Sequence, residues 1–349
     1  MLTACESSNV DTPGGSLSEY RRMAASDVHA LQLVKLDSIT LGTTDSSVFE
    51  ITDLEIHDGN LFVVDSKANV IKVFDGRGRF IRTIGREGKG PGEFEDPFAL
   101  AFGNEELYVV DLGAGKRFAA FDREGRFVNM RESNTPTNPI SIAASKDLIV
   151  TMSGLTITDP SRQGWDVVGI TKSSGEVVGK GCAMDPRYLE SSRNKGMIWH
   201  FDFGSVAVHG DRIYCIQTIS PVVQVMDFAG KRVEEIRVAP PFYQAPEDVK
   251  EVLNQKAIFD YLGTFTAHAH FFPVESGFIS AYTRFDSEAG EVRYHLFACN
   301  REPSLRCGVI QNVRKPVYAA SADTIYLEEE VGPNEPMRIG IYRLTRAER

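Results

Sequence analysis

The sequence lacks any long hydrophobic run and carries no surplus of positive charge. No apolar stretch approaches the ~18 residues that a membrane-spanning helix requires, and the composition is ordinary for a soluble globular protein. The 48 acidic residues outnumber the 38 basic ones, which gives a formal net charge of −10. Because nucleic-acid binding needs clustered positive charge, we expect no nucleic-acid partner.

Several motifs that carry chemistry are also absent. The five cysteines show no spacing typical of a zinc site, and no serine stands in a Gly-x-Ser-x-Gly elbow. The stretch 85–94, GREGKGPGEF, lacks the Gly-Lys-Ser/Thr ending of a phosphate-binding loop. Its glycines indicate tight turns between repeats instead.

What the sequence does contain is a repeat built on short strands. Residues 71–94 contain a strand, a four-residue turn, a strand and a glycine-rich connection, and residues 117–130 repeat the hairpin. A period of this kind indicates a repeat architecture. The strand that is second in each unit recurs at six places, which begin at Leu61, Leu107, Leu148, Ile213, Phe278 and Ile325.

The sixth unit ends one strand short, at IGIYRL, whereas residues 31–39 form a spare strand before the first unit. Donating this strand closes the ring and leaves no long unpaired edge. The sequence therefore predicts an all-β fold, a six-bladed β-propeller with four-stranded antiparallel blades and N-terminal closure. Residues 29–346 form this single domain, and an insertion at 240–263 adds one helix between blades 4 and 5.

The repeats resemble those of known propellers. The motifs are LYVVD at 107–111, Phe121-Asp122-x-x-Gly125 and the glycine-rich stretch 85–94. They resemble NHL-type propellers, and more closely the six-bladed β-propeller lipoproteins of Bacteroidota and related bacteria. The resemblance implies the fold but little chemistry.

The N-terminus, Leu2-Thr3-Ala4-Cys5, resembles the lipobox of bacterial lipoproteins, in which the cysteine is acylated. The residues after Cys5 form a polar tether that cannot build a core, and no apolar signal region precedes it. We interpret residues 1–28 as a lipobox remnant and tether. The expectation is a monomeric outer-membrane lipoprotein of the cell envelope, facing the periplasm or the cell surface, which meets the membrane through its lipid only.

The other four cysteines divide into two pairs. Cys299 and Cys307 flank the loop CNREPSLRC and in an oxidising compartment would form a disulfide worth about 2–3 kcal/mol, the alternative being two reduced, half-buried thiols. We interpret Cys182 and Cys215 as small core residues.

The loops are distributed unevenly over the two faces of the predicted ring. One face has short turns, and the other holds the insertions 153–165, 184–199, 240–263, 284–291 and 328–337. Since long loops on a rigid scaffold commonly carry function, we expect binding on this long-loop face, around the channel mouth. The residues expected there are Lys89, Asn138, Tyr188, Trp199, His200, Tyr243, His268, His270 and Lys315.

A metal site is the alternative at the channel mouth. His268 and His270 are predicted on one side of the innermost strand of blade 5, where they could ligate zinc together with His200, as in zinc-holding NHL-type lyases. Six-bladed lactonases instead hold calcium with acid and amide oxygens, for which Asp53, Asn138 and Asp202 are the candidates. Lys315 nearby would repel a cation, so we expect no cofactor.

The expected function is therefore that of a lipid-anchored, non-enzymatic propeller that binds a protein, peptide or glycan through its long-loop face. The alternatives are a metal-dependent lyase or lactonase at the channel mouth, and a purely structural part of an envelope complex. No catalytic residue is identified by the sequence.

Overall fold

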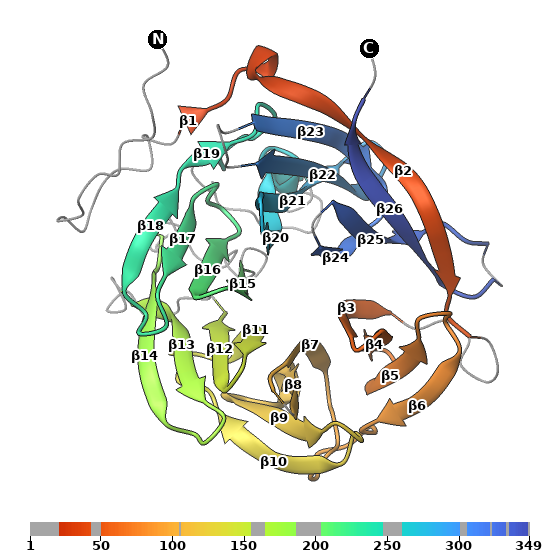
Figure 1. The fold of residues 1–349 in the computed structure, drawn as a ribbon, viewed down its shortest axis with the longest axis vertical. Helices are drawn as coiled ribbons and strands as arrows, with labels where there is room; N and C mark the ends of the chain where they lie inside the picture. Colours follow the sequence, from red (N-terminus) through yellow and green to blue (C-terminus); the bar gives the residue numbers. More distant parts are fainter. Residues whose placement is uncertain are drawn as a thin grey trace.

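The computed structural model describes residues 21–42, 50–104, 106–154, 165–185, 204–246, 260–300, 306–321, 323–332 and 335–347. Its strands form six blades around a central axis, and the first strand of each blade lies innermost (Figure 1). Within each blade, neighbouring strands pair antiparallel. The predicted six-bladed propeller with four-stranded blades is therefore confirmed.

In blades 1 to 5 the strands follow one another in chain order from the centre to the rim, and in blade 6 the N-terminal β2 takes the outermost place. Blade 1 contains β3 (Ile51–His57), β4 (Asn60–Asp65), β5 (Val70–Asp75) and β6 (Phe80–Ile84). Blade 2 contains β7 (Pro97–Phe102), β8 (Glu106–Asp111), β9 (Arg117–Asp122) and β10 (Phe127–Glu132). Blade 3 contains β11 (Pro139–Ser145), β12 (Leu148–Ser153), β13 (Asp166–Lys172) and β14 (Val177–Ala183). Blade 4 contains β15 (Gly204–His209), β16 (Arg212–Gln217), β17 (Val223–Met226) and β18 (Arg232–Ile236). Blade 5 contains β20 (Ala267–Val274), β21 (Gly277–Asp286), β22 (Glu291–Asn300) and β23 (Arg306–Val313). Blade 6 contains β24 (Val317–Ser321), β25 (Thr324–Glu329), β26 (Arg338–Arg346) and β2 (Val28–Thr40).

The N-terminal strand closes the ring as predicted and extends further. β2 pairs antiparallel with β26 from Leu31 opposite Arg346 to Thr40 opposite Arg338. Its first three residues also pair in parallel with β23, which joins blades 5 and 6 into one eight-stranded sheet. Upstream, β1 (Arg21–Arg22) pairs with β19 (Val238–Ala239) at the rim. The N-terminal segment therefore follows the outer rim and covers strand edges that would otherwise be unpaired (Figure 1).

The hydrophobic core lies between adjacent blades. Phe62, Val64 and Ile71 of blade 1 form one buried cluster with Leu107 and Phe121 of blade 2. Each such side chain contributes about 1.5–3 kcal/mol when it is removed from water. Because every blade packs on both neighbours, the ring fixes the inner strands in place.

The repeated aspartate–glycine turn has the same hydrogen bonds in three blades. The Gly78 N–H donates to the Asp75 carbonyl, and the same bond recurs between Gly125 and Asp122 and between Gly230 and Asp227. Gly78 has φ +80°, which favours glycine, and a Cβ there would stand 2.0 Å from the Thr40 carbonyl of β2. The turn of blade 1 therefore also makes room for the closing strand.

Two disulfides are present, and one of them corrects the sequence-based interpretation. Cys299 and Cys307 form the predicted bond across β22 and β23. Cys182 and Cys215 also bond to each other, although the sequence suggests two separate core residues. Both sulfurs are buried, and the bond links β14 of blade 3 to β16 of blade 4. A bridge over 33 residues limits the unfolded chain more than one over 8, by loop-closure arithmetic about 4 against about 2 kcal/mol.

The insertion between blades 4 and 5 is described only at its ends. The predicted helix from Pro246 lies mostly outside the described residues, although residues 260–262 are helical. In the described part of the chain, no helix is long and apolar enough to cross a membrane.

Glu329 of β25 contacts two side chains of the closing strand β2 and one of β26. Its carboxylate accepts hydrogen bonds from the Ser38 hydroxyl (2.6 Å) and the Tyr342 hydroxyl (2.8 Å), and it pairs with the Lys35 ammonium at 2.6 Å. Burial acts to raise the pKa of Glu329, but the bonds from Lys35, Ser38 and Tyr342 outweigh it and lower this pKa to about 2. Glu329 is thus a polar link between the two ends of the domain.

Replacing Glu329 by glutamine should lower the free energy of unfolding by about 2 kcal/mol at pH 7, because the amide loses the ion pair and one acceptor. The pKa of Glu329 is depressed in the folded state, so its contribution is present above the ordinary value of 4.5 and is lost as the pH falls toward 2. Denaturant unfolding at pH 7 and pH 3 measures both effects. Glu330→Gln, at an exposed neighbour, is the control with little expected change. An equal loss for Glu329→Gln at both pH values would contradict the prediction.

Candidate functional site

A cavity of about 720 Å³ lies along the propeller axis. The innermost strands of all six blades contribute to its wall. In blade 5 the lining continues through Leu262, Phe265 and the far ends of β21 and β22. These segments belong to the long-loop face, so the cavity reaches the side on which the sequence predicts binding. Its volume is within the range typical of sites for small ligands.

Two acidic side chains of β3 stand in this wall. The Asp53 carboxylate accepts hydrogen bonds from the backbone N–H of Leu54 and of Leu100 in β7, at 2.8 and 2.9 Å. Burial raises the pKa of Asp53 to about 6, against the lowering effect of these two donors. Burial, and then the charge of Asp53, raise the pKa of Glu55 to about 8. In the described part of the chain, neither carboxylate has an ion pair with lysine or arginine.

The acid pair departs from the repeat. At the corresponding place of blade 3, the Ser141 hydroxyl accepts from the Val206 N–H of the next blade, which is the role that Asp53 has between blades 1 and 2. β3 reads ITDLEIH, whereas none of the other five inner strands carries an acidic side chain. This difference is a sequence signal for Glu55, a residue that the sequence analysis did not select.

His268 and His270 do not lie on the same side of β20, contrary to the prediction. A β-bulge between them pairs His268 with Tyr282 and His270 with Ala281. Since Ala281 and Tyr282 are consecutive in β21, their partners face opposite sides of the sheet. The His268 ring is fully buried, stacks on Tyr282 at 4.4 Å and contacts Ser220 and Ser280. It therefore packs in blade 5.

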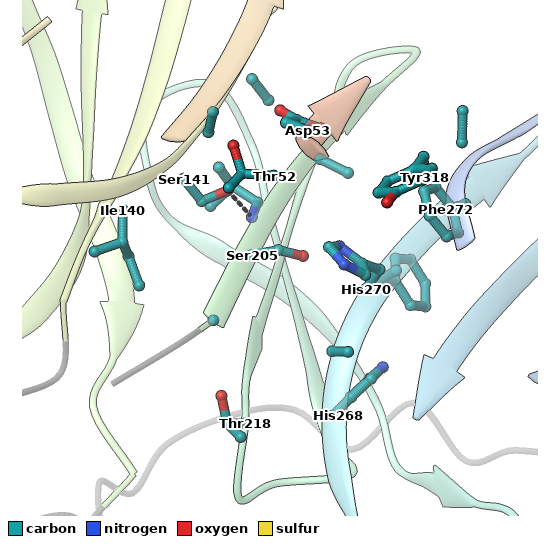
Figure 2. A pocket seen from close by; sticks show the side chains of 18 of the residues that line it. Thr52, Asp53, Ile140, Ser141, Ser205, Thr218, His268, His270, Phe272 and Tyr318 are labelled. Atoms are coloured by element: carbon teal, nitrogen blue, oxygen red, sulfur yellow. Dashed lines mark hydrogen bonds between the residues drawn. The ribbon is translucent and has the colours of Figure 1, made fainter. Parts of the chain in front are cut away.

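His270 faces the axis instead. Figure 2 shows its ring directed toward the same space as Asp53, Ser205 and Tyr318, which come from blades 1, 4 and 6. The ring stacks on Phe272. Burial lowers the pKa of His270 to about 4, so the imidazole is neutral at pH 7 and offers one donor and one acceptor.

Tyr318 of β24 connects the cavity to a charged pair behind it. Its hydroxyl donates to the Glu328 carboxylate at 2.8 Å, and the same carboxylate pairs with the Lys315 ammonium at 3.0 Å. Lys315 is therefore neutralised by Glu328 just before β24 begins. Burial, and then the negative charge of Glu328, raise the pKa of Tyr318, which keeps the phenol neutral.

The segment 284–291 is a β-hairpin rather than a loop. β21 and β22 remain paired out to Asp286 opposite Glu291, and each strand has ten residues. The second strands of blades 1 to 4 have six. Because Arg284, Phe285 and Val292 line the cavity, this extended hairpin forms one side of its mouth.

Of the other residues expected on the long-loop face, two are exposed, one is buried and three lie outside the described residues. The Lys89 side chain is 83% exposed and pairs with Glu95, and Asn138 is exposed just before β11. Tyr243 is only 1% exposed, and its hydroxyl donates to the Ile219 carbonyl, so it packs beneath the surface. Tyr188, Trp199 and His200 lie outside the described residues, as does Asp202.

The described residues do not bring a metal-ligand set together. Among them, no group of three or more His, Cys, Asp or Glu side chains is arranged to hold an ion. The bulge at Ala269 separates the two histidines that the sequence analysis treated as one pair.

Comparisons with known proteins agree with the fold. A family model described as a 6-bladed β-propeller, DUF5128, matches residues 18–156. A Bacteroides fragilis protein presumed to be exported superposes with a TM-score of 0.66 at 12% identity, covering 92% of this chain and 98% of that one. A member of the DUF4221 family from Bacteroides vulgatus gives 0.62 at 10% identity, covering 91% and 99%. The sequence matches no curated protein. The chain is thus a six-bladed β-propeller, and identities this low establish the fold alone.

The raised pKa of Glu55 predicts a specific dependence of stability on pH. The folded state keeps a proton on Glu55 up to about pH 8, whereas the unfolded chain loses it near the ordinary value of 4.5. The contribution of Glu55 to the free energy of unfolding is therefore fully present below pH 4.5 and is lost as the pH rises through 8. Glu55→Gln cannot ionise, so its free energy of unfolding should not show this part of the decline. The difference in free energy of unfolding between the variant and the wild type should therefore shift in favour of the variant by roughly 1–3 kcal/mol between pH 5 and pH 8.

Denaturant unfolding at several pH values measures this gain. Glu124→Gln removes an acid that is 66% exposed in a turn and serves as the control. If Glu55→Gln and Glu124→Gln give parallel curves, Glu55 ionises as an ordinary exposed acid and the prediction is wrong.

Proposed function

We propose that this propeller is a binding protein of the cell envelope that takes a peptide, or an extended segment of a partner protein, into the axial cavity. The observation that carries the proposal is the cavity itself, about 720 Å³, walled by all six blades and bordered by the blade 5 hairpin. Sites of this size commonly combine apolar walls with a few polar groups that fix orientation.

The lining has this mixed character. Phe98, Phe272 and Phe285 provide apolar surface, and Asp53 and His270 provide polar atoms. A partner with a flat surface would not use a cavity of this volume, whereas an extended segment can place one or two side chains in it. This favours a peptide segment over the glycan that the sequence analysis left open.

The envelope location is supported by three independent features. The sequence around Cys5 resembles a lipobox, the two disulfides favour an oxidising compartment, and the structurally similar Bacteroides fragilis protein is presumed to be exported. A lipid at Cys5 would hold the propeller at a membrane through the tether that precedes β1.

The metal-dependent lyase or lactonase is not favoured by the described residues, among which no group of three or more His, Cys, Asp or Glu side chains is arranged to hold an ion. His200 of the zinc set and Asp202 of the calcium set lie outside them. The zinc form needs His268 and His270 on one ion, and the two rings lie on opposite faces of blade 5. The proposed binding function requires no metal ion and no shared ligation by these two histidines.

Filling the cavity should abolish peptide binding. Phage carrying random heptapeptides are selected on the immobilised wild-type protein, and the selected peptides are then tested on Ser205→Tyr, which places a phenol in the cavity wall. We expect at least a tenfold loss of affinity. Ser174→Tyr, in an exposed turn between β13 and β14, is the matched control and should bind as the wild type does. Peptides that bind both variants equally would show that the cavity is not the site.

The lipid anchor is tested separately. Expressed behind a lipoprotein signal peptide, the wild-type protein should incorporate radiolabelled palmitate and sediment with membranes, and Cys5→Ser should do neither. Ser7→Ala, in the same tether, should behave as the wild type. Membrane sedimentation of the unlabelled Cys5→Ser variant would refute anchoring through this cysteine.

A further inference from the structure

The acid pair of β3 lies in the cavity wall, and the described residues leave it without a counter-ion. No lysine or arginine of the described chain pairs with Asp53 or Glu55, while Lys315 is engaged by Glu328 and Arg284 donates to the Gly263 carbonyl. Both carboxyl groups have backbone N–H contacts with β7. A carboxylate has about four lone-pair sites, so these contacts leave acceptor capacity on both groups.

A second feature of the same cavity also lacks a partner. The Thr218 side chain is 6% exposed, lines the cavity and has no hydrogen-bond partner for its hydroxyl among the described residues. Figure 2 shows the Thr218 hydroxyl on the side that faces the other lining residues. A buried hydroxyl without a partner costs about 1–3 kcal/mol, which a ligand with a polar group at this place would recover.

The positions of these groups define the chemistry of the ligand. The acids belong to blade 1, whereas Thr218 follows β16 of blade 4, and Figure 2 shows Asp53 and Thr218 in different parts of the cavity. A ligand that satisfies both therefore carries a positive charge and, at some distance from it, a neutral hydrogen-bonding group. A peptide with a basic side chain has both, since its backbone amides supply the neutral group.

We propose that the axial cavity is specific for basic peptide segments, and that a lysine or arginine side chain of the ligand pairs with Asp53 and Glu55 while the peptide backbone bonds to Thr218. This inference rests on the function proposed above and names the class of its ligand. The net charge of −10 also favours a basic ligand, because it attracts cationic partners over longer distances.

Pairing with a cation should change the protonation of the site. In the free protein Glu55 is largely protonated at pH 7 and Asp53 largely ionised. An ammonium or guanidinium group beside them favours the charged form, so binding should release up to one proton. The other titratable groups that line the cavity near the acids are Tyr318 and His270, both neutral at pH 7, and β7 contributes none. Arg284 of β21 also lines the cavity, at its mouth, and remains a cation.

The test uses the tightest cavity-dependent heptapeptide from the selection described above and a second version in which norleucine replaces its basic residue. Norleucine keeps the apolar stem and removes the charge. For the wild-type protein this replacement should weaken binding at least tenfold, and for Asp53→Asn/Glu55→Gln it should cost less than threefold. Asparagine and glutamine retain an acceptor oxygen for the backbone donors, and thermal melting verifies the fold.

Calorimetry supplies a second readout. Binding of the basic peptide at pH 7, compared in phosphate and Tris buffers, should release close to one proton from the wild-type protein and none from the Glu55→Gln single variant. Thr218→Val should weaken both peptides equally, because it acts on the backbone and not on the charge. Glu124→Gln, which removes an acid from a distant turn, should leave the affinity and the proton release unchanged.

The outcomes separate this inference from the function on which it rests. If no selected peptide distinguishes the wild type from Ser205→Tyr, the proposed function fails and this inference with it. If the selected peptides depend on the cavity but lack basic residues, or if the norleucine peptide binds the wild type equally well, the function stands and the cationic ligand is wrong. A charge-dependent affinity that persists in Asp53→Asn/Glu55→Gln would also overturn the assignment to the acid pair.

Discussion

The structure depends on one pairing between the two ends of the chain, that of β2 with β26. A ring of blades has no free edge only if its last blade is completed, and here the missing strand comes from residues that precede the first blade. The same strand continues onto β23, so that it fastens blade 5 as well as blade 6. Release of β2 must therefore break strand pairing on two blades.

Closure also sets the electrostatics of the axis. Two aspartates of one blade illustrate this. The pKa of Asp75, in a rim turn, is lowered by the Arg79 backbone N–H and by the Arg79 side chain. The pKa of Asp53 is raised to about 6, because the surrounding inner strands exclude water and backbone N–H groups only partly compensate. The same type of side chain is thus ionised in a turn at the rim, whereas at the axis its pKa lies close to neutral pH.

The sequence predicts the regular part of this molecule well, because the repeat is encoded locally. The strands of blades 1 and 2 and the turn at Asp75 follow from alternation and from glycine position, and each needs only its neighbours. The disulfide between Cys182 and Cys215 does not follow, since its partners belong to different blades and meet only when the blades pack. The orientation of His268 depends on a single bulge residue, which reverses the side to which every earlier residue of the strand points.

The candidate site is formed where the repeat is interrupted. Two departures converge on the cavity: two acids in an inner strand, and a hairpin four residues longer per strand than the second strands of blades 1 to 4. The bulge that directs only one histidine of β20 to the axis belongs to the repeat, since a bulge occurs at the same place in β3, β7, β11 and β24. The fold of the other blades needs neither departure, and the acids oppose stability, since burial disfavours their charged forms. Features that cost folding energy and meet in one cavity are best explained by a ligand that recovers that energy on binding. The basic peptide segment proposed above would supply that energy through a cation placed beside the acid pair.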